Sequence, residues 1–125
     1  MQPKNPLAPL SSYLYIDRMK PLKFTGSSED DLAAFPREVK QAAGFQLFRV
    51  QAGLMPADWK PMLNVGAGAY EIRLHVLGEW RVMYVAKFAD AVYVLHAFQK
   101  KTQQTRKEDI ELAATRYKQL KESTK

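Results

Sequence analysis

Three strands are predicted by one stretch of the sequence, residues 70–98, which reads YEIRLHVLGEWRVMYVAKFADAVYVLHAF. Apolar and polar side chains alternate over residues 70–75, the pattern of a strand with one buried face. Gly78 indicates a turn before a second strand at 80–87, and another short turn precedes an apolar third strand at 92–98. Because such short links join antiparallel neighbours, we expect a meander, with the apolar third strand at the centre of the sheet.

A helical hairpin is predicted before the meander. Residues 22–25 have the composition of a short strand, and the Gly-Ser-Ser sequence that follows offers a hydroxyl to cap a helix. Three acidic residues come next, where the helix dipole favours negative charge. Pro36 suits the first turn of a second helix, which we expect to end at Gly53 and to be followed by a loop over 54–69. The buried side of this second helix is expected to consist of Val39, Ala43, Leu47 and Val50.

One further helix is predicted after the meander. Thr105 and Glu108 have the spacing of a capping box, in which both side chains accept hydrogen bonds from backbone N–H groups. The apolar stripe of this helix consists of Ile110, Ala113, Tyr117 and Leu120. We therefore predict a compact α+β fold, with a small antiparallel sheet packed against an N-terminal helical hairpin and a C-terminal helix. Residues 1–19, with three prolines and no periodic pattern, are predicted to be a partly disordered extension of a domain at 20–122.

The composition narrows the kinds of function that the chain can have. It has 125 residues and a formal net charge of +6, which favours acidic or polyanionic partners over neutral ones. It contains no cysteine, which excludes disulfides, thiolate zinc sites and cysteine nucleophiles. The two histidines, His75 and His96, do not indicate a metal site, and no apolar run approaches the ~20 residues of a membrane span. We expect a cytosolic protein that needs no cofactor.

Charged side chains gather on one face of the predicted sheet. Alternation places Glu71 and Arg73 on the face opposite to the apolar one, so we expect both to point outward. Arg81 on the next strand can lie across from Arg73, and Lys100 and Lys101 leave the end of the last strand. Arginine suits phosphate because its planar fork bonds two oxygens at once. The alternative is that these are solvated charges on the open face of a half-buried sheet.

This set of side chains suits one class of chemistry. Cleavage of an RNA phosphodiester by its own 2′-hydroxyl needs a base, cations that stabilise the phosphorane and an acid for the leaving oxygen; a metal is not obligatory. The cluster supplies the cations. His96 lies in an apolar strand, where a core histidine with a satisfied hydrogen bond is expected rather than a catalytic one. Trp59 and Trp80 are expected to anchor loops or core rather than to stack on bases.

Several runs of residues, taken in order, form a more specific pattern. They are Leu32-x-x-Phe35-Pro36, Tyr70 to Arg73, Trp80 to Val85, and Leu95 to Thr102 followed by Glu111-Leu112-Ala113 and Arg116. This ordered set resembles phage-derived toxins of the RelE/HigB superfamily, and the likeness covers roughly residues 20–120. The resemblance implies a ribonuclease-like α+β fold, cleavage of mRNA, commonly on the ribosome, and neutralisation by a cognate helix-turn-helix antitoxin.

The resemblance also implies roles for individual residues. Arg81 matches a phosphate-binding arginine, Arg73 a basic residue of the preceding strand, and Lys101, beside Lys100, the basic residue after the last strand. Glu71 stands where RelE toxins have a lysine; Glu71 as base and a lysine as acid is one assignment that remains open. The C-terminal tyrosine of RelE and the Asp-Tyr-His run of HigB have no counterpart here. A catalytically inactive binding or regulatory protein of phage origin is therefore the alternative function.

Overall fold

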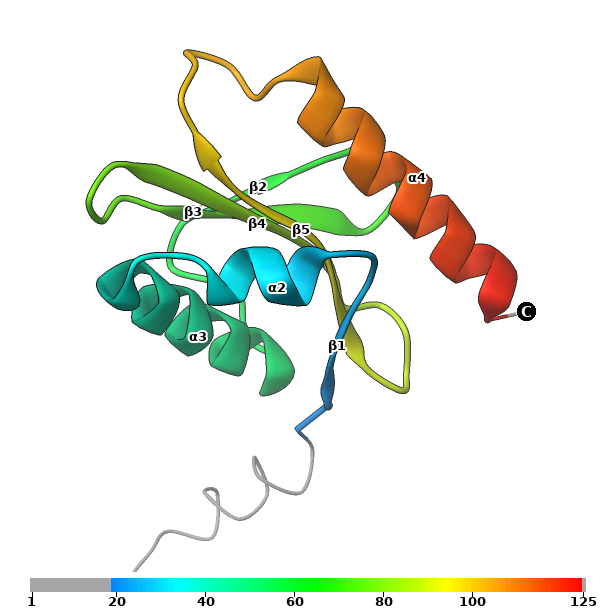
Figure 1. The fold of residues 1–125 in the computed structure, drawn as a ribbon. Coiled ribbons are helices and arrows are strands. Elements are labelled where there is room, and N and C mark those ends of the chain that lie inside the picture. Colours follow the sequence, from blue (N-terminus) through cyan, green and yellow to red (C-terminus); the bar gives the residue numbers. More distant parts are fainter. Residues whose placement is uncertain (1–18, 125) are drawn as a thin grey trace, which may run out of the picture.

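The computed structural model describes residues 19–124, which form a five-stranded sheet with helices on both faces (Figure 1). The strands are β1 (Leu22–Phe24), β2 (Trp59–Pro61), β3 (Ala69–Leu74), β4 (Glu79–Val85) and β5 (Val92–Lys100). The helices are α2 (Ser28–Ala33), α3 (Arg37–Gln51) and α4 (Lys107–Ser123). The predicted α+β class and RelE-like arrangement of a sheet, a helical hairpin and a C-terminal helix are confirmed.

The sheet has the strand order β1-β5-β4-β3-β2 and is antiparallel except at one edge. The predicted meander is present, with Ile72 of β3 opposite Val82 of β4, and Val82 opposite Ala97 of β5. The exception is β1, which pairs in parallel with β5 through Leu22 and Val92. Strand β5 is therefore internal, but the middle strand is β4, because one short edge strand is added on each side of the meander.

Strand β2 lies in the segment for which the sequence indicated only a loop. Its three residues pair antiparallel with β3, and Lys60 lies opposite Glu71. Pro61 is tolerated because β2 is an edge strand, where a missing backbone N–H costs no ladder hydrogen bond within the sheet. A strand of three residues that ends in a proline is too short for alternation to be visible, which is why the prediction missed it.

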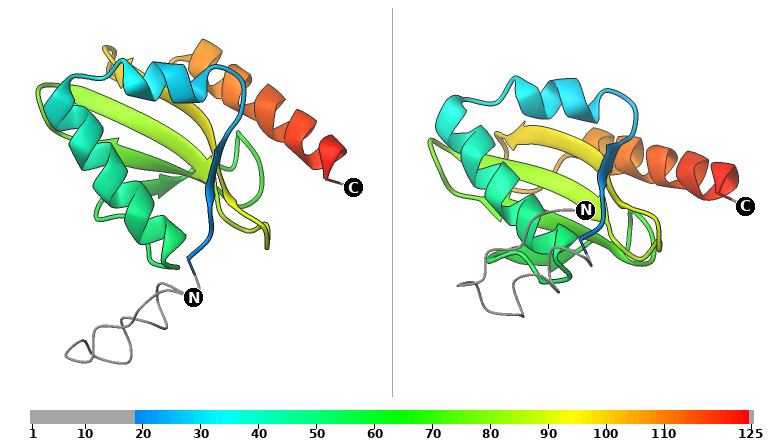
Figure 2. Two further views of the ribbon diagram at one scale, coloured as in Figure 1. Left: turned by 60° about the horizontal axis from the view of Figure 1, so that its bottom comes forward. Right: turned by 90° about the horizontal axis from the view of Figure 1, so that it is seen from below.

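One face of the sheet is covered by α2 and α3, as Figure 2 shows from two directions. The buried residues of α3 are those predicted: Val39, Ala43, Leu47 and Val50. They form a core with apolar residues of β3, β4 and β5, among them Ile72, Val82 and Val94. Pro36 directly precedes α3, and Gly53 follows it with a positive φ of 86°, so the expected start and end of this helix are confirmed.

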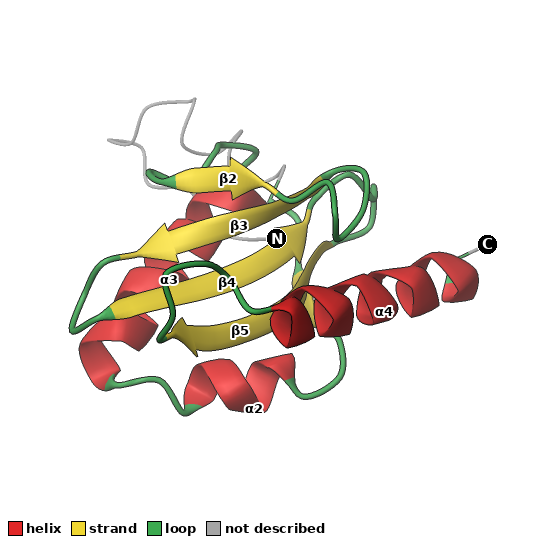
Figure 3. Ribbon diagram, turned by 90° about the horizontal axis from the view of Figure 1, so that it is seen from above, coloured by secondary structure: helices red, strands yellow, loops and turns green. Residues whose placement is uncertain are grey.

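The other face of the sheet is covered by α4, but only at one end (Figure 3). Ala113, Tyr117 and Leu120 of the predicted stripe are buried, and Ile110 is partly buried. They form a second core with Met83, Val85 and Leu95. The segment that connects β5 to α4 passes over the remainder of this sheet face and lies in front of β4 in Figure 3.

The predicted capping box at the start of α4 is wrong. The helix begins at Lys107, Arg106 is its N-cap residue, and no side chain of the described residues caps it. The Thr105 hydroxyl instead donates to the Glu71 carboxylate, over 3.4 Å between Oγ1 and Oε2. The Thr105 hydroxyl therefore bonds to the buried carboxylate of Glu71 and not to a backbone N–H of α4, as the local sequence pattern had indicated.

Two further sequence predictions concern the N-terminal extension and membrane-spanning segments. Residues 1–18 of the predicted N-terminal extension lie outside the described residues. None of the helices within residues 19–124 has both the length and the apolar character to cross a membrane.

Candidate functional site

A groove of about 440 Å³ lies on the part of the sheet that α4 leaves uncovered. Its walls come from the edge strand β2, from β3 and β4, and from the segment between β5 and α4. We call it the basic groove, and the charged and polar residues that line it are Lys60, Asn64, Glu71, Arg73, Arg81, Lys100, Gln103, Gln104 and Thr105.

Arg73 and Arg81 are direct cross-strand partners on the groove face of the sheet, as the alternation required. Their environments differ. Arg81 is held beneath the groove: its Nη2 donates to Glu79 Oε1 over 3.0 Å, and its Nη1 donates to the backbone carbonyl of Trp80 over 2.9 Å. Its Nε lies 3.5 Å from Glu71 Oε1, and only 2% of its side chain is exposed. Arg81 and Glu71 thus form a buried ion pair.

The expectation that Glu71 points out to solvent is therefore wrong. The side chain of Glu71 is only 3% exposed, although it stands on the face opposite to the first core. The burial has two causes, because β2 extends the sheet beside Glu71 and the segment containing Thr105 passes over it. Burial raises the pKa of the Glu71 carboxyl above its usual range, and the Arg81 guanidinium and the Thr105 hydroxyl offset this only in part.

Arg73 is the arginine that the groove leaves available. Its side chain is partly exposed, and its Nε is buried without a hydrogen-bond partner among residues 19–124. The Nε of Arg81 is likewise buried without a hydrogen-bond partner, so the two arginines differ in their exposure: Arg81 is almost fully buried, and Arg73 is the one that an anion in the groove can contact. Arg73 therefore has the chemistry of an anion-binding residue rather than of a structural one.

The lysines of the predicted cluster are divided between two places. Lys100 lines the basic groove, where its Nζ donates to the carbonyl of Gln103 over 2.7 Å. Lys101 is exposed and lines a neighbouring pocket instead. The groove also contains Lys60, which the sequence analysis did not single out, because nothing indicated that its three-residue strand pairs with β3.

A second charged cluster surrounds His75, and Glu79 connects it to Arg81 of the groove. The exposed imidazole lies between two carboxylates, with Nε2 at 2.6 Å from Asp58 Oδ2 and Nδ1 at 2.8 Å from Glu79 Oε2. The hydrogen bonds to Asp58 and Glu79 raise the pKa of His75 above its ordinary value. Since Glu79 also accepts from Arg81, this cluster links the surface of the molecule to the buried ion pair.

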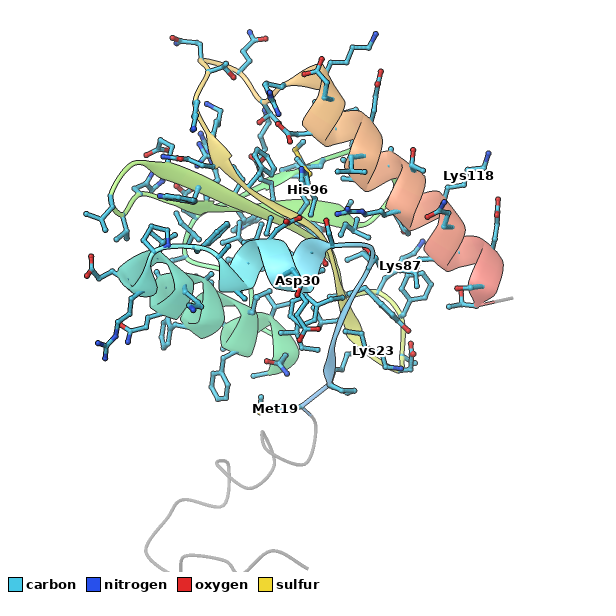
Figure 4. The ribbon with its side chains drawn as sticks, in the orientation of Figure 1. Met19, Lys23, Asp30, Lys87, His96 and Lys118 are labelled. Atoms are coloured by element: carbon cyan, nitrogen blue, oxygen red, sulfur yellow. The ribbon has the colours of Figure 1, made fainter. Side chains whose placement is uncertain are left out.

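His96 is a residue of β5, and its side chain contacts the first turn of α4 (Figure 4). Its Nε2 is 2.8 Å from Asp109 Oδ1, and Asp109 in turn accepts from Arg106 Nε over 3.1 Å. The expected core histidine is therefore present, but only half satisfied, because its Nδ1 is buried and has no hydrogen-bond partner among the described residues. Across residues 19–124, no three histidine or carboxylate side chains come together as a metal-binding group.

The family model of phage derived protein Gp49-like (DUF891) matches residues 30–118, most of the chain. The chain belongs to the Gp49-like family. A comparison with curated proteins finds no match. The Gp49-like region runs from α2 to the last turns of α4, and it contains every residue of the basic groove. The groove is thus part of the domain that defines the family and not an addition to it.

Proposed function

We propose that this Gp49-like protein is the toxin of a type II toxin–antitoxin system, an endoribonuclease that cleaves mRNA without a metal ion. The observation that carries the proposal is the basic groove itself. It combines a partly exposed arginine with an unpaired N–H, Arg73, and a buried carboxylate with a raised pKa, Glu71. These two groups supply the base and a cation, two of the three requirements of phosphodiester cleavage by the 2′-hydroxyl.

In the proposed reaction the groove holds one phosphate of the RNA chain. Arg73, Lys60 and Lys100 bind its oxygens and stabilise the charge of the phosphorane. Glu71 removes the proton of the adjacent 2′-hydroxyl, whose oxygen attacks phosphorus while the bond to the 5′-oxygen breaks. A groove lysine donates a proton to that leaving oxygen, since lysine is protonated at neutral pH. The products are a 2′,3′-cyclic phosphate and a 5′-hydroxyl.

Arg81 has a supporting role in this scheme. Its guanidinium is almost entirely buried and already bonded to Glu79 and to a backbone carbonyl, so it cannot clasp a phosphate without giving up these bonds. It lies 3.5 Å from Glu71 and limits the rise of that carboxyl's pKa. Arg81 therefore keeps the base ionised and in place, while Arg73 makes the contact with RNA.

The resemblance to RelE/HigB toxins implies the partners, and the positive charge of the groove suits them. Lys101, next to Lys100 of the groove, extends the positive charge beyond the groove, toward a longer stretch of mRNA or the RNA of the ribosome. An antitoxin with an acidic segment can occupy the groove in place of RNA and so block it. We propose a helix-turn-helix antitoxin as that partner and the cytoplasm as the place of action.

The test is to express the chain without an antitoxin and to map the mRNA ends that appear. Growth arrest with new ends carrying a 5′-hydroxyl and a cyclic or 3′-phosphate is expected, because the 2′-oxygen is the nucleophile. The Glu71→Gln variant is the matched control, since it keeps the shape of the site and removes the base. Intact mRNA on expression of the wild-type chain, or ends with a 5′-phosphate, would contradict the proposed activity.

The burial of Glu71 also predicts how cleavage depends on pH. A base must be ionised, so the rate should fall as the pH falls through the pKa of Glu71. Because burial raises that pKa, the midpoint should lie above the value of about 4.3 that is usual for glutamate. The measurement is the cleavage rate of one RNA by purified protein across the acidic range. A rate that stays constant down to the usual glutamate pKa excludes Glu71 as the base.

One observation favours a second function. Glu71 and Arg81 are both almost fully buried and form an ion pair, an arrangement that also occurs in proteins as a structural element. On this reading the Gp49-like protein binds RNA or a host protein through its exposed lysines and Arg73 and cleaves nothing. Binding to ribosomes with no new mRNA ends is the result that separates this function from the first.

A further inference from the structure

A second pocket, of about 360 Å³, lies beside the basic groove. Its lining includes Phe98, Lys100, Lys101, Arg106 and Asp109, and we call it the Phe98 pocket. The two cavities are neighbours, because Lys100 lines both. They are also adjacent in the sheet, because Phe98 is the direct cross-strand partner of Arg81. Directly opposite side chains on one sheet face have Cβ atoms about 5 Å apart.

We propose that the Phe98 pocket binds one nucleobase of the RNA strand whose phosphate lies in the basic groove, by stacking on the Phe98 ring. The proposal rests on the proposed function, because it takes RNA as the ligand of the groove. It adds a site that the phosphate chemistry does not require, and it names Phe98, Arg106 and Asp109 as parts of that site.

Phe98 has the properties of a stacking platform. Its side chain is partly exposed and lies on the same sheet face as Arg81, among charged groups. Its ring lies nearly parallel to the imidazole of His96, with 4.7 Å between centroids and 23° between planes. A ring that is already stacked on one neighbour loses little freedom when a base is added, and stacking accepts any base because each has a π-face.

The neighbours of Phe98 hold this platform in place. His96 is fixed by Asp109, and Asp109 is fixed by Arg106, through contacts of 2.8 Å and 3.1 Å. His96 and Asp109 are each only 6% exposed, so this chain of contacts is shielded from water. Arg106 itself is exposed and lines the pocket together with Lys101, which gives the pocket two cations for the phosphate that follows the stacked base.

The test measures the binding of a single-stranded RNA that cannot be cleaved, with a 2′-O-methyl group at each position. The probes are the intact RNA and a series in which one base at a time is absent. For the wild-type chain, removal of the base at one position should weaken binding by about tenfold or more, as expected for the loss of one stacked base. At that position, 2-aminopurine should lose fluorescence on binding, and this readout does not depend on any variant.

Phe98→Leu should lose the same factor for the intact RNA and show no further loss when the base is absent. Phe98→Trp should retain the wild-type pattern. Phe48→Leu is the matched control, because Phe48 is an exposed aromatic residue of α3, on the opposite face of the sheet, and its loss should change nothing. Equal affinity of Phe98→Leu and wild type, or a loss on base removal that persists in Phe98→Leu, overturns the proposal.

The experiment also separates this proposal from the one on which it rests. If Arg73→Ala weakens RNA binding and Phe98→Leu does not, the groove binds RNA and the base pocket is wrong. If the wild-type chain binds none of the RNAs, both proposals are overturned together.

Discussion

Replacing Arg73 with alanine is expected to lower the rate of mRNA cleavage by about 10²–10³-fold, the usual effect of removing one donor that stabilises transition-state charge. Arg73 is partly exposed in the basic groove, and its Nε has no hydrogen-bond partner among the described residues. The variant therefore removes the proposed phosphate contact and breaks no side-chain hydrogen bond or ion pair found among residues 19–124. The free energy of unfolding should change by less than about 0.5 kcal/mol, as for most surface positions.

The measurements are the cleavage rate under saturating RNA and the midpoint of unfolding in urea. Arg37→Ala is a suitable control, because Arg37 is an exposed arginine at the start of α3, on the sheet face that lies away from the groove. It changes the net charge by the same amount, so any general loss of RNA attraction appears in both variants. A cleavage rate for Arg73→Ala equal to that of Arg37→Ala would remove Arg73 from the site.

Replacing Arg81 with alanine is expected to destabilise the fold by about 3–5 kcal/mol, the usual cost of removing one partner of a buried ion pair. The Arg81 side chain is 2% exposed, and it contacts Glu71, Glu79 and the carbonyl of Trp80. Without it, the Glu71 carboxylate stays buried with no cation beside it at 3.5 Å. Urea unfolding at neutral pH measures the loss, which is a large part of the stability of an average domain.

A double variant distinguishes the ion pair from simple packing. Arg81→Met combined with Glu71→Leu removes both charges and keeps most of the volume, so it should recover more than half of the lost stability. If the double variant is as unstable as Arg81→Ala, the loss comes from packing and not from an unpaired carboxylate. Since Arg81→Ala affects folding, its cleavage rate alone does not reveal a role in catalysis, and Arg73→Ala is the sharper test.

The elements of the fold could be predicted from the sequence wherever a periodic pattern was long enough. The four buried positions of α3 recur at helical spacing, and the three strands of the meander are separated by short turns. The edge strand β2 and the pairing of the edge strand β1 could not be predicted from such patterns. β2 has three residues and one of them is proline, and the parallel pairing of β1 with β5 depends on contacts between distant parts of the chain.

The candidate site could be predicted in part. Alternation and register are local properties, and they correctly brought Arg73 opposite Arg81. Burial is not local: Glu71 and Arg81 are covered by β2 and by the segment before α4, which contribute Lys60 and Thr105. The same segment turns Lys101 toward the Phe98 pocket. A sequence pattern within one strand contains no information about these distant contacts.

The parallel pairing of β1 with β5 affects how the chain folds while it is being synthesised. It joins Leu22 to Val92, so the first strand of the domain stays without its neighbour until most of the chain has been synthesised. Non-local pairings of this kind form late and slowly compared with helices and hairpins. The basic groove needs a still later segment, which carries Thr105. A polypeptide still being translated thus lacks a finished groove until the segment that carries Thr105 has been synthesised and has folded over the sheet.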